Sequence, residues 1–199
     1  NMTKFYKSMM SCTLGIFIAI GFSINVYAKP EINPLGANIA DVGSKYYSFK
    51  VKEFKSNDKQ RTYKVWLGIP HEITNPQKEY SSLCMLDGNS AMSHLDDNIL
   101  KSLAEEDAPV LVAIGYKTNL PFESESRALD YTSADKALGK PAPDPRNPKR
   151  MSGGSADFRT VIVEDIAPWV EQNVKLEANK RAIWGHSYGG VFISEYAVY

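Results

Sequence analysis

Three features are scarce or missing in this sequence, and each absence narrows the class of protein. Neither charge predominates, because 23 basic residues balance 23 acidic ones. The protein therefore lacks the excess of positive charge that favours binding to nucleic acid. Cysteine occurs only at Cys12 and Cys84, and no cluster of cysteine and histidine has the spacing of a metal site. No apolar run reaches the length of a comfortable membrane span. We therefore expect no metal, no other cofactor and no nucleic-acid partner.

The first 28 residues differ in composition from the rest of the chain. Two early lysines precede a short apolar run at residues 13–24, and Val26-Tyr27-Ala28 has the small-x-small pattern of a cleavage site. This pattern predicts a secretory signal peptide over residues 1–28 and an exported, periplasmic protein. An uncleaved segment, with residues 8–27 anchoring the chain at the inner membrane, is the alternative. Cleavage would remove Cys12 and leave Cys84 as a single, buried structural thiol.

Beyond the leader, strand-like and helix-like segments alternate. Residues 29–44 contain prolines and glycines and predict an irregular lead-in. The first two strands have alternating apolar residues and should form an antiparallel hairpin. The expected strands are 47–54, 61–69, 82–86, 110–114 and a short buried one at 182–184, and the expected helices are 91–105, one opening at 155 and one from 191. Five prolines make 117–153 a long irregular excursion, Ser155 is the expected N-cap of its helix, and Pro168 should kink that helix.

The most informative stretch is Gly185-His186-Ser187-Tyr188-Gly189, between the last predicted strand and helix. A G-x-S-x-G sequence in a strand–turn–helix context is the nucleophile elbow of an α/β-hydrolase. The turn would strain Ser187, would require glycine at 185 and 189, and would place the serine hydroxyl at a helix N-terminus. We therefore predict an α/β fold of the α/β-hydrolase type over residues 45–199, with a mostly parallel sheet and an antiparallel N-terminal hairpin.

Ester chemistry at a serine also needs hydrogen-bond donors for the oxyanion. One is expected from the backbone N–H of Tyr188, which follows the nucleophile. The second is expected from the backbone N–H of Gly88 or Asn89, because Asp87-Gly88-Asn89 follows the third predicted strand. An ordinary strand-to-helix turn capped by Asp87 is the alternative interpretation.

An ordered series of short motifs resembles one family. The motifs are Leu86-Asp87-Gly88-Asn89, Ile114-Gly115-Tyr116, Thr118-Asn119-Leu120-Pro121-Phe122, Ser126-Arg127-Ala128-Leu129-Asp130-Tyr131-Thr132, Ser152-Gly153-Gly154 and the elbow from Trp184 to Gly190. They extend over most of residues 45–199 and look like the periplasmic siderophore trilactone esterases, in the broader esterase group that includes ferric enterobactin esterase. The resemblance implies a serine hydrolase with a Ser–His pair that cleaves ester bonds of a catecholate siderophore, ferric or iron-free.

Carried over by position, the resemblance makes Ser187 the nucleophile and places Arg127, Tyr131 and Asp87 on the substrate side. A guanidinium there can bind catecholate oxygens or another anionic group in a bidentate manner. The alternative is that Arg127 pairs with Asp130 or Asp87 and only pins the long loop.

The chain departs from the family at the base histidine, which should lie well downstream of the nucleophile. No histidine follows Ser187. His186 adjoins the nucleophile, His71 follows a strand-ending proline, and His94 could approach the site, although a capping or surface role is favoured. Because the last residues still have a helical pattern, we expect an N-terminal fragment of a longer enzyme, without the C-terminal part of the fold, or the product of an interrupted gene. The alternatives are a non-catalytic remnant or binding protein, and a general carboxylesterase or acyltransferase that shares the elbow.

Overall fold

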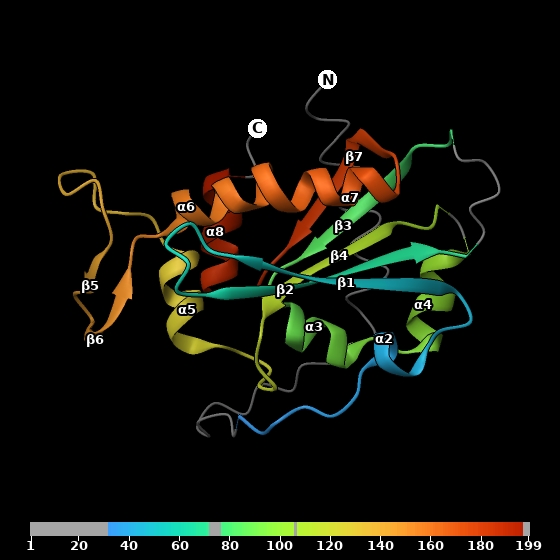
Figure 1. Ribbon diagram of the computed structural model, residues 1–199, viewed down its shortest axis with the longest axis horizontal. Helices are drawn as coiled ribbons and strands as arrows, with labels where there is room; N and C mark the ends of the chain where they lie inside the picture. Colours follow the sequence, from blue (N-terminus) through green and yellow to red (C-terminus); the bar gives the residue numbers. More distant parts are fainter. Residues whose placement is uncertain (1–31, 72–76, 106, 197–199) are drawn as a thin grey trace. The chain divides into compact units, whose positions relative to one another are not determined.

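In the computed structural model of the protein, which describes residues 32–71, 77–105 and 107–196, a five-stranded mixed sheet forms the centre (Figure 1). Its strands are β1 (Tyr47–Lys55), β2 (Thr62–Pro70), β3 (Tyr80–Met85), β4 (Val110–Tyr116) and β7 (Leu176–Trp184), in the spatial order β1-β2-β4-β3-β7. Strand β2 is antiparallel to both of its neighbours, whereas β4, β3 and β7 are parallel to one another. The predicted α/β class, with its N-terminal hairpin and mostly parallel sheet, is confirmed.

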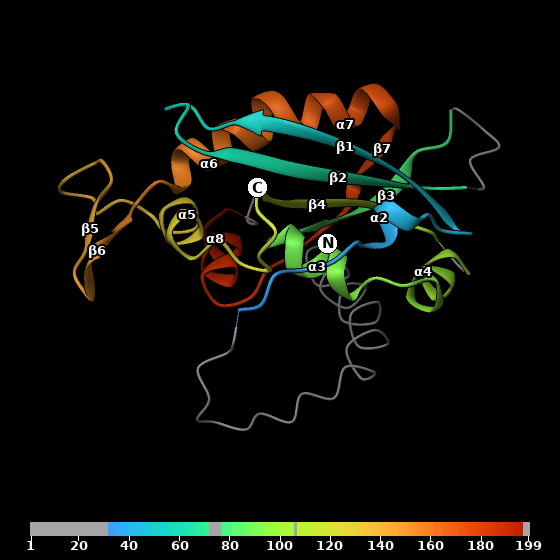
Figure 2. The same ribbon diagram turned by 60° about the horizontal axis from the view of Figure 1, so that its bottom comes forward.

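Helices cover both faces of this sheet (Figures 1 and 2). They are α2 (Ile39–Val42), α3 (Gly88–His94), α4 (Asp97–Ala104), α5 (Ser124–Asp130), α6 (Ser155–Val161), the π-helical turn η1 (Ile162–Ile166), α7 (Ala167–Asn173) and α8 (Tyr188–Tyr196). In both views α6, η1 and α7 run along one face, and α3 and α4 lie on the other. None of the helices between residues 32 and 196 combines the length and the apolar character needed to span a bilayer.

The core is divided by strand β4, which is buried along its whole length, as its β-branched sequence predicts. Val112 and Ile114 belong to the cluster that includes the apolar face of α6 and α7. Leu111 and Ala113 belong to the cluster that includes residues of α3 and α4. This alternation along a single strand places one layer of helices on each face of the sheet.

The continuous helix predicted over 91–105 is wrong, because two helices occupy this stretch. Leu95 is extended, with φ −80° and ψ 132°, and ends α3. The carboxylate of Asp96 then caps α4 by accepting a hydrogen bond from the backbone N–H of Ile99 at 2.9 Å. The apolar spacing continues across the break, so hydrophobic periodicity alone did not reveal it.

Residues 117–153 are more ordered than predicted. They contain helix α5, whose first turn is capped by Glu123, and a separate two-stranded sheet formed by β5 (Ala142–Asp144) and β6 (Asn147–Ser152). The predicted irregular lead-in is likewise not wholly irregular, since Asn38 and Asp41 form a capping box around the single turn α2. The predicted leader, residues 1–28, lies outside the described residues.

Three smaller expectations change in the C-terminal part. Gly154, not Ser155, occupies the N-cap position of α6. Pro168 was expected to kink its helix, but it lies in the first turn of α7. The irregular part of this helical segment is the π-helical turn η1, which comes directly before α7. Strand β7 extends from residue 176 instead of 182 and is only half-buried near its end, because no described strand pairs with its outer edge.

Candidate active site

Two strained turns lie side by side at the carboxyl ends of two neighbouring strands. Strands β3 and β7 are parallel neighbours, with Met85 opposite Trp184, so the turns that follow them meet. Asp87 has φ +50° and Ser187 has φ +55°, both in the left-handed region that residues with a side chain rarely adopt. Such strain persists only where the surrounding structure holds it, and it concentrates at functional sites.

The turn at Ser187 depends on a close approach between the end of β7 and the start of α8. A Cβ atom added to Gly185 would lie 2.7 Å from the backbone carbon of Gly189, too close for any side chain. A Cβ atom at Gly189 would meet nothing nearer than 3.6 Å, so glycine is required at 185 and not at 189. Ser187 is exposed at this turn, and its carbonyl accepts the N–H of Val191 in the first turn of α8.

We expect Gly185→Ala and Gly189→Ala to differ sharply in stability. The first forces backbone atoms apart and should lower the free energy of unfolding by about 1–3 kcal/mol, the range of overpacked sites. The second adds a methyl group that makes ordinary van der Waals contacts with Leu86 and Tyr131 within a helix, and it should be neutral or stabilising by up to about 1 kcal/mol. Urea denaturation of both variants measures this difference, and equal losses would contradict the close approach at residue 185.

Arg127 of α5 ties the two strained turns together. Its Nε and Nη2 atoms donate to the two carboxylate oxygens of Asp87, each at 2.8 Å. Nη2 also donates to the carbonyl oxygen of His186 at 3.1 Å, one residue before Ser187. The side chains of Arg127 and Asp87 are only 13% and 2% exposed. Burial alone would lower the pKa of Arg127, but the hydrogen bonds and charge of Asp87 raise it above its ordinary value, so the guanidinium stays charged.

This pairing decides between the two partners expected for Arg127 and excludes one role for Asp87. Arg127 binds Asp87, whereas Asp130 binds Arg61. Asp87 occupies the N-cap position of α3, but its side chain makes no capping hydrogen bond, so the interpretation of Asp87 as a residue that only caps the helix is wrong. Its carboxylate holds the arginine instead.

Aromatic rings enclose the guanidinium of Arg127. Its central carbon lies 5.5 Å from the ring centroids of Phe122 and Tyr131 and 5.7 Å from that of Tyr188. Tyr131 is wholly buried, and its hydroxyl accepts the backbone N–H of Asp87 at 3.0 Å. Tyr131 therefore stabilises the turn after β3. Because its side chain is buried, the substrate contact predicted for it is not assigned. The rings of Phe122 and Tyr188 were not predicted here, although Phe122 is only five residues from the arginine.

The turn after β3 is fixed to the end of β4. The buried Asn89 side chain donates to the carbonyl oxygens of Tyr116 and Thr118 at 2.9 and 3.1 Å, and it accepts the N–H of Tyr116 at 2.8 Å. A Cβ atom at Gly88 would lie 2.7 Å from the backbone nitrogen of Gly115. The backbone of Gly88 and Asn89, where the second oxyanion donor is expected, is therefore held in one position.

The three histidines are held elsewhere. His71 Nδ1 lies 2.8 Å from the carbonyl oxygen of Lys45, and His94 Nδ1 lies 2.7 Å from that of Ser90 in its own helix. His186 contributes its carbonyl to Arg127. No hydrogen bond joins any of them to Ser187 in the part of the chain that the structure describes, so none is assigned as the base.

Cys84 and the acidic residues offer no second reactive centre. Cys84 is a free cysteine on β3, and burial of its thiol raises the pKa to about 12, so the thiol stays protonated and poorly nucleophilic. Among residues 32–71, 77–105 and 107–196, no three His, Cys, Asp or Glu side chains gather as metal ligands would.

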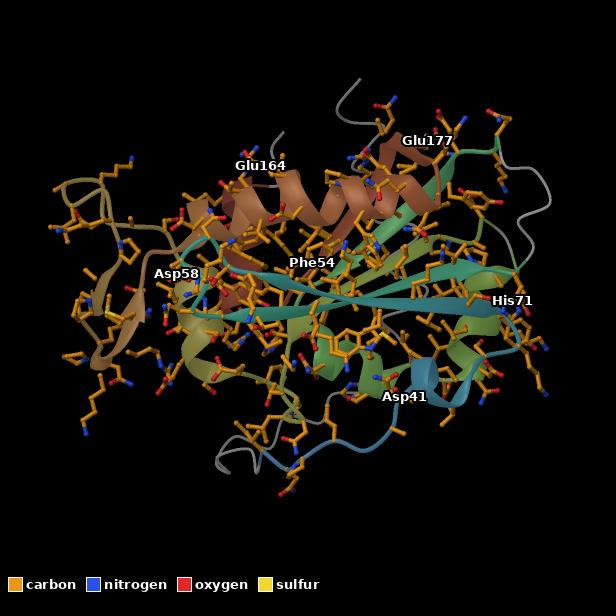
Figure 3. The ribbon with its side chains drawn as sticks, viewed as in Figure 1. Asp41, Phe54, Asp58, His71, Glu164 and Glu177 are labelled. Atoms are coloured by element: carbon orange, nitrogen blue, oxygen red, sulfur yellow. The ribbon has the colours of Figure 1, made fainter. Side chains whose placement is uncertain are left out.

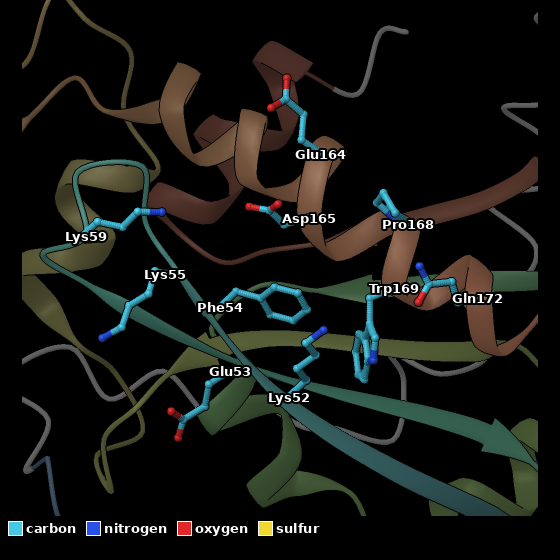
Figure 4. Close-up of a pocket in the computed structure, with 10 residues that line it drawn as sticks. All are labelled: Lys52, Glu53, Phe54, Lys55, Lys59, Glu164, Asp165, Pro168, Trp169 and Gln172. Atoms are coloured by element: carbon cyan, nitrogen blue, oxygen red, sulfur yellow. The ribbon is translucent and has the colours of Figure 1, made fainter.

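A surface cavity of about 400 Å³ lies between β1 and the helical segment η1–α7 (Figure 4). It is lined by Lys52, Glu53, Phe54, Lys55, Lys59, Glu164, Asp165, Pro168, Trp169 and Gln172. Its three lysines balance three carboxylates, so its charge selects no ligand. A second cavity of about 320 Å³ lies at the β5–β6 hairpin, and no predicted site residue lines either one.

A serine in a left-handed turn between a parallel strand and a helix, beside a second turn that follows the neighbouring strand, defines the α/β-hydrolase class. Residues 56–193 match the family described as "Putative esterase". The chain belongs to this family.

Individual relatives agree with this assignment. The chain is 48% identical to the apo-salmochelin esterase of Escherichia coli O6:H1 over 171 residues, which is 86% of this chain and 53% of the relative. It is 30% identical to the ferri-bacillibactin esterase BesA of Bacillus subtilis, over 72% of this chain and 51% of the relative. The solved structure of the enterobactin hydrolase IroE in complex with DFP matches with 46% identity and a TM-score of 0.69, over 79% of this chain and 60% of that one. The chain thus spans about half the length of the two curated relatives.

Proposed function

We propose that this chain carries the nucleophile of an exported serine esterase that cleaves ester bonds of catecholate siderophores. The observation that carries the proposal is the exposed Ser187 in its left-handed turn, with the guanidinium of Arg127 bonded to the carbonyl one residue earlier. The names of the relatives, esterases for salmochelin and bacillibactin, support the substrate class.

The reaction would proceed through an acyl-enzyme. Ser187 Oγ attacks the ester carbonyl as a base removes the hydroxyl proton, and the resulting oxyanion accepts hydrogen bonds from the backbone N–H of Tyr188 and of Gly88 or Asn89. As the tetrahedral intermediate collapses, the C–O bond to the leaving group breaks and the protonated base gives its proton to the leaving alcohol; water, deprotonated by the same base, then attacks the acyl-serine and releases the acid and the free Ser187 hydroxyl. The start of α8 adds a favourable helix dipole at the site of negative charge.

Arg127 can bind the substrate as well as stabilise the two turns of the site. Asp87 and the His186 carbonyl occupy its Nε and Nη2 atoms, but within the described residues its Nη1 atom donates no hydrogen bond. Those two N–H groups are available to a substrate oxygen. The carboxylate of Asp87 thus orients the arginine, and the catecholate or another anionic group would bind its opposite edge.

We also propose that residues 1–28 form a signal peptide and direct the enzyme to the periplasm. The support is the order of lysines, short apolar run and small-x-small pattern in the sequence. Anchoring at the membrane through residues 8–27 is the alternative.

The substrate class is tested by comparing an iron-free catecholate trilactone with a neutral short-chain ester, using the full natural protein. We expect a higher kcat/KM for the trilactone. Arg127→Ala should lower kcat/KM for the trilactone by about 10- to 100-fold, the value of a hydrogen bond to a charged group, and should affect the neutral ester less. Arg146→Ala is the matched control, because Arg146 is an exposed arginine paired only with Asp144 among the described residues.

Each alternative function predicts a different result. A general carboxylesterase would cleave both esters equally well, and an acyltransferase would transfer the acyl group to an added alcohol. A binding protein would bind the trilactone without turnover. An equal loss on both substrates in Arg127→Ala would mean that the arginine has only a structural role.

A further inference from the structure

We propose that Arg61 and Asp130 are positioning residues for the active site. By holding Asp130 in a separate ion pair, Arg61 leaves Arg127 with Asp87 as its one carboxylate partner among the residues that the structure describes, and so keeps the guanidinium beside Ser187. Only the activity readout of this inference rests on the proposed function.

Asp130 is a wholly buried carboxylate at the end of α5. Arg61 Nη2 donates to its Oδ1 atom at 2.9 Å, Arg61 Nε lies 3.4 Å from Oδ2, and the Tyr116 hydroxyl donates to Oδ2 at 2.8 Å. Burial raises the pKa of Asp130, and the charge of Arg61 and the Tyr116 hydrogen bond only partly offset this. A buried carboxylate of this kind strongly requires a partner.

The turn between β1 and β2 presents Arg61 to that carboxylate. The buried Ser56 hydroxyl accepts the N–H of Arg61 at 2.9 Å and donates to Asp58 at 2.6 Å. Asp58 also pairs with Arg61 Nη1 at 3.0 Å, and Figure 3 shows Asp58 at this turn. The arginine therefore approaches α5 from a fixed hairpin.

Arg127 and Asp130 are three residues apart on α5, the spacing at which side chains of opposite charge usually meet on a helix. In this protein they do not pair, because each has another partner on a different element. If Arg61 were absent, a buried, unpaired carboxylate would lie one turn from a cation. We expect Arg127 to turn toward it, which would break its hydrogen bonds to Asp87 and to the His186 carbonyl.

The test compares Arg61→Met with the double variant Arg61→Met/Asp130→Asn in the full natural protein. The double variant removes the competing charge but keeps a carbonyl that can accept the Tyr116 hydrogen bond. Asp58→Asn is the matched control, since it removes the exposed partner of Arg61 and leaves Asp130 paired. Arg61→Lys retains the charge without the planar fork and provides a folded variant should Arg61→Met fail to fold.

The first readout is independent of catalysis. The NMR signal of the Arg127 Nε–H, assigned with Arg127→Lys, should shift in Arg61→Met, shift partly in Arg61→Lys, and stay near its wild-type position in the double variant and in Asp58→Asn. An unchanged signal in both Arg61 variants would overturn the proposal and would mean that Asp130 takes up a proton instead of recruiting Arg127.

The second readout is kcat/KM for a catecholate trilactone, normalised to the fraction of Ser187 labelled by a fluorophosphonate. Arg61→Met should lose about 100-fold, as expected for misplaced active-site groups, and the added Asp130→Asn should restore most of this activity. A purely structural pair would lower the labelled fraction but leave the normalised rate unchanged, which would also overturn the proposal. If the wild type shows no Ser187-dependent hydrolysis, the proposed function fails and the NMR comparison still decides the inference.

Discussion

Replacement of Ser187 by alanine is expected to lower kcat/KM for ester hydrolysis by about 10⁶-fold, as in serine hydrolases that lose their nucleophile. The physical reason is that no acyl-enzyme can form without the hydroxyl, while the oxyanion donors and Arg127 remain in place. Binding of a catecholate trilactone should therefore change little. Steady-state kinetics and a binding titration with the same substrate measure the two effects separately.

The control for this substitution is Ser194→Ala on α8, the helix that follows Ser187. Ser194 is exposed, and its hydroxyl donates to the carbonyl of Val191 within α8 at 2.7 Å. This variant should keep full activity and should still be labelled once by an organophosphate such as DFP, at Ser187. Labelling at another serine, or undiminished hydrolysis by Ser187→Ala, would exclude the proposed nucleophile.

Asp87→Ala is expected to have the largest effect on stability, lowering the free energy of unfolding by about 3 kcal/mol or more. It would leave the guanidinium of Arg127, which is 13% exposed, without its carboxylate partner. Loss of this partner also releases the link between the β3 turn and α5, so activity should fall together with stability. Urea denaturation at neutral pH measures the change.

A surface ion pair provides the comparison. Lys117 and Glu53 lie 3.1 Å apart with side chains 64% and 45% exposed, so Glu53→Ala should cost less than about 1 kcal/mol. Similar losses in the two variants would show that the Arg127–Asp87 pair contributes no more than an exposed one. In that case the Arg127–Asp87 pair would orient the two turns but would not stabilise the fold.

The elements that were predicted correctly have a strong local signal. The alternating hairpin strands, the β-branched strand β4 and the glycine-framed turn at Ser187 each depend on residues close together in the sequence. The break within 91–105 was missed because the apolar period runs through Leu95, whereas the interruption comes from the Asp96 cap. Hydrophobic spacing reports which face is buried and not where a helix stops.

The ion pairs of the site could be predicted only in part, because they join residues far apart in the chain. Arg127 and Asp87 are 40 residues apart, and Arg61 and Asp130 are 69 apart. For Arg127 the sequence offered both the nearby Asp130 and the distant Asp87 as partners, and the choice between them depends on the hairpin turn that supplies Arg61. The partner of a buried charge is thus decided by the tertiary fold, not by helical spacing.

The left-handed backbone at Asp87 and Ser187 also limits how this protein can be made more heat-resistant. Each residue stores local strain, of order 1–3 kcal/mol, that glycine would relieve. At Asp87 the loss of the buried ion pair with Arg127 would outweigh this relief, whereas at Ser187 a screen that selects only for thermal resistance would favour glycine and would discard the hydroxyl. Thermostable variants should be sought at the distant exposed loops, where rigidity and chemistry do not compete.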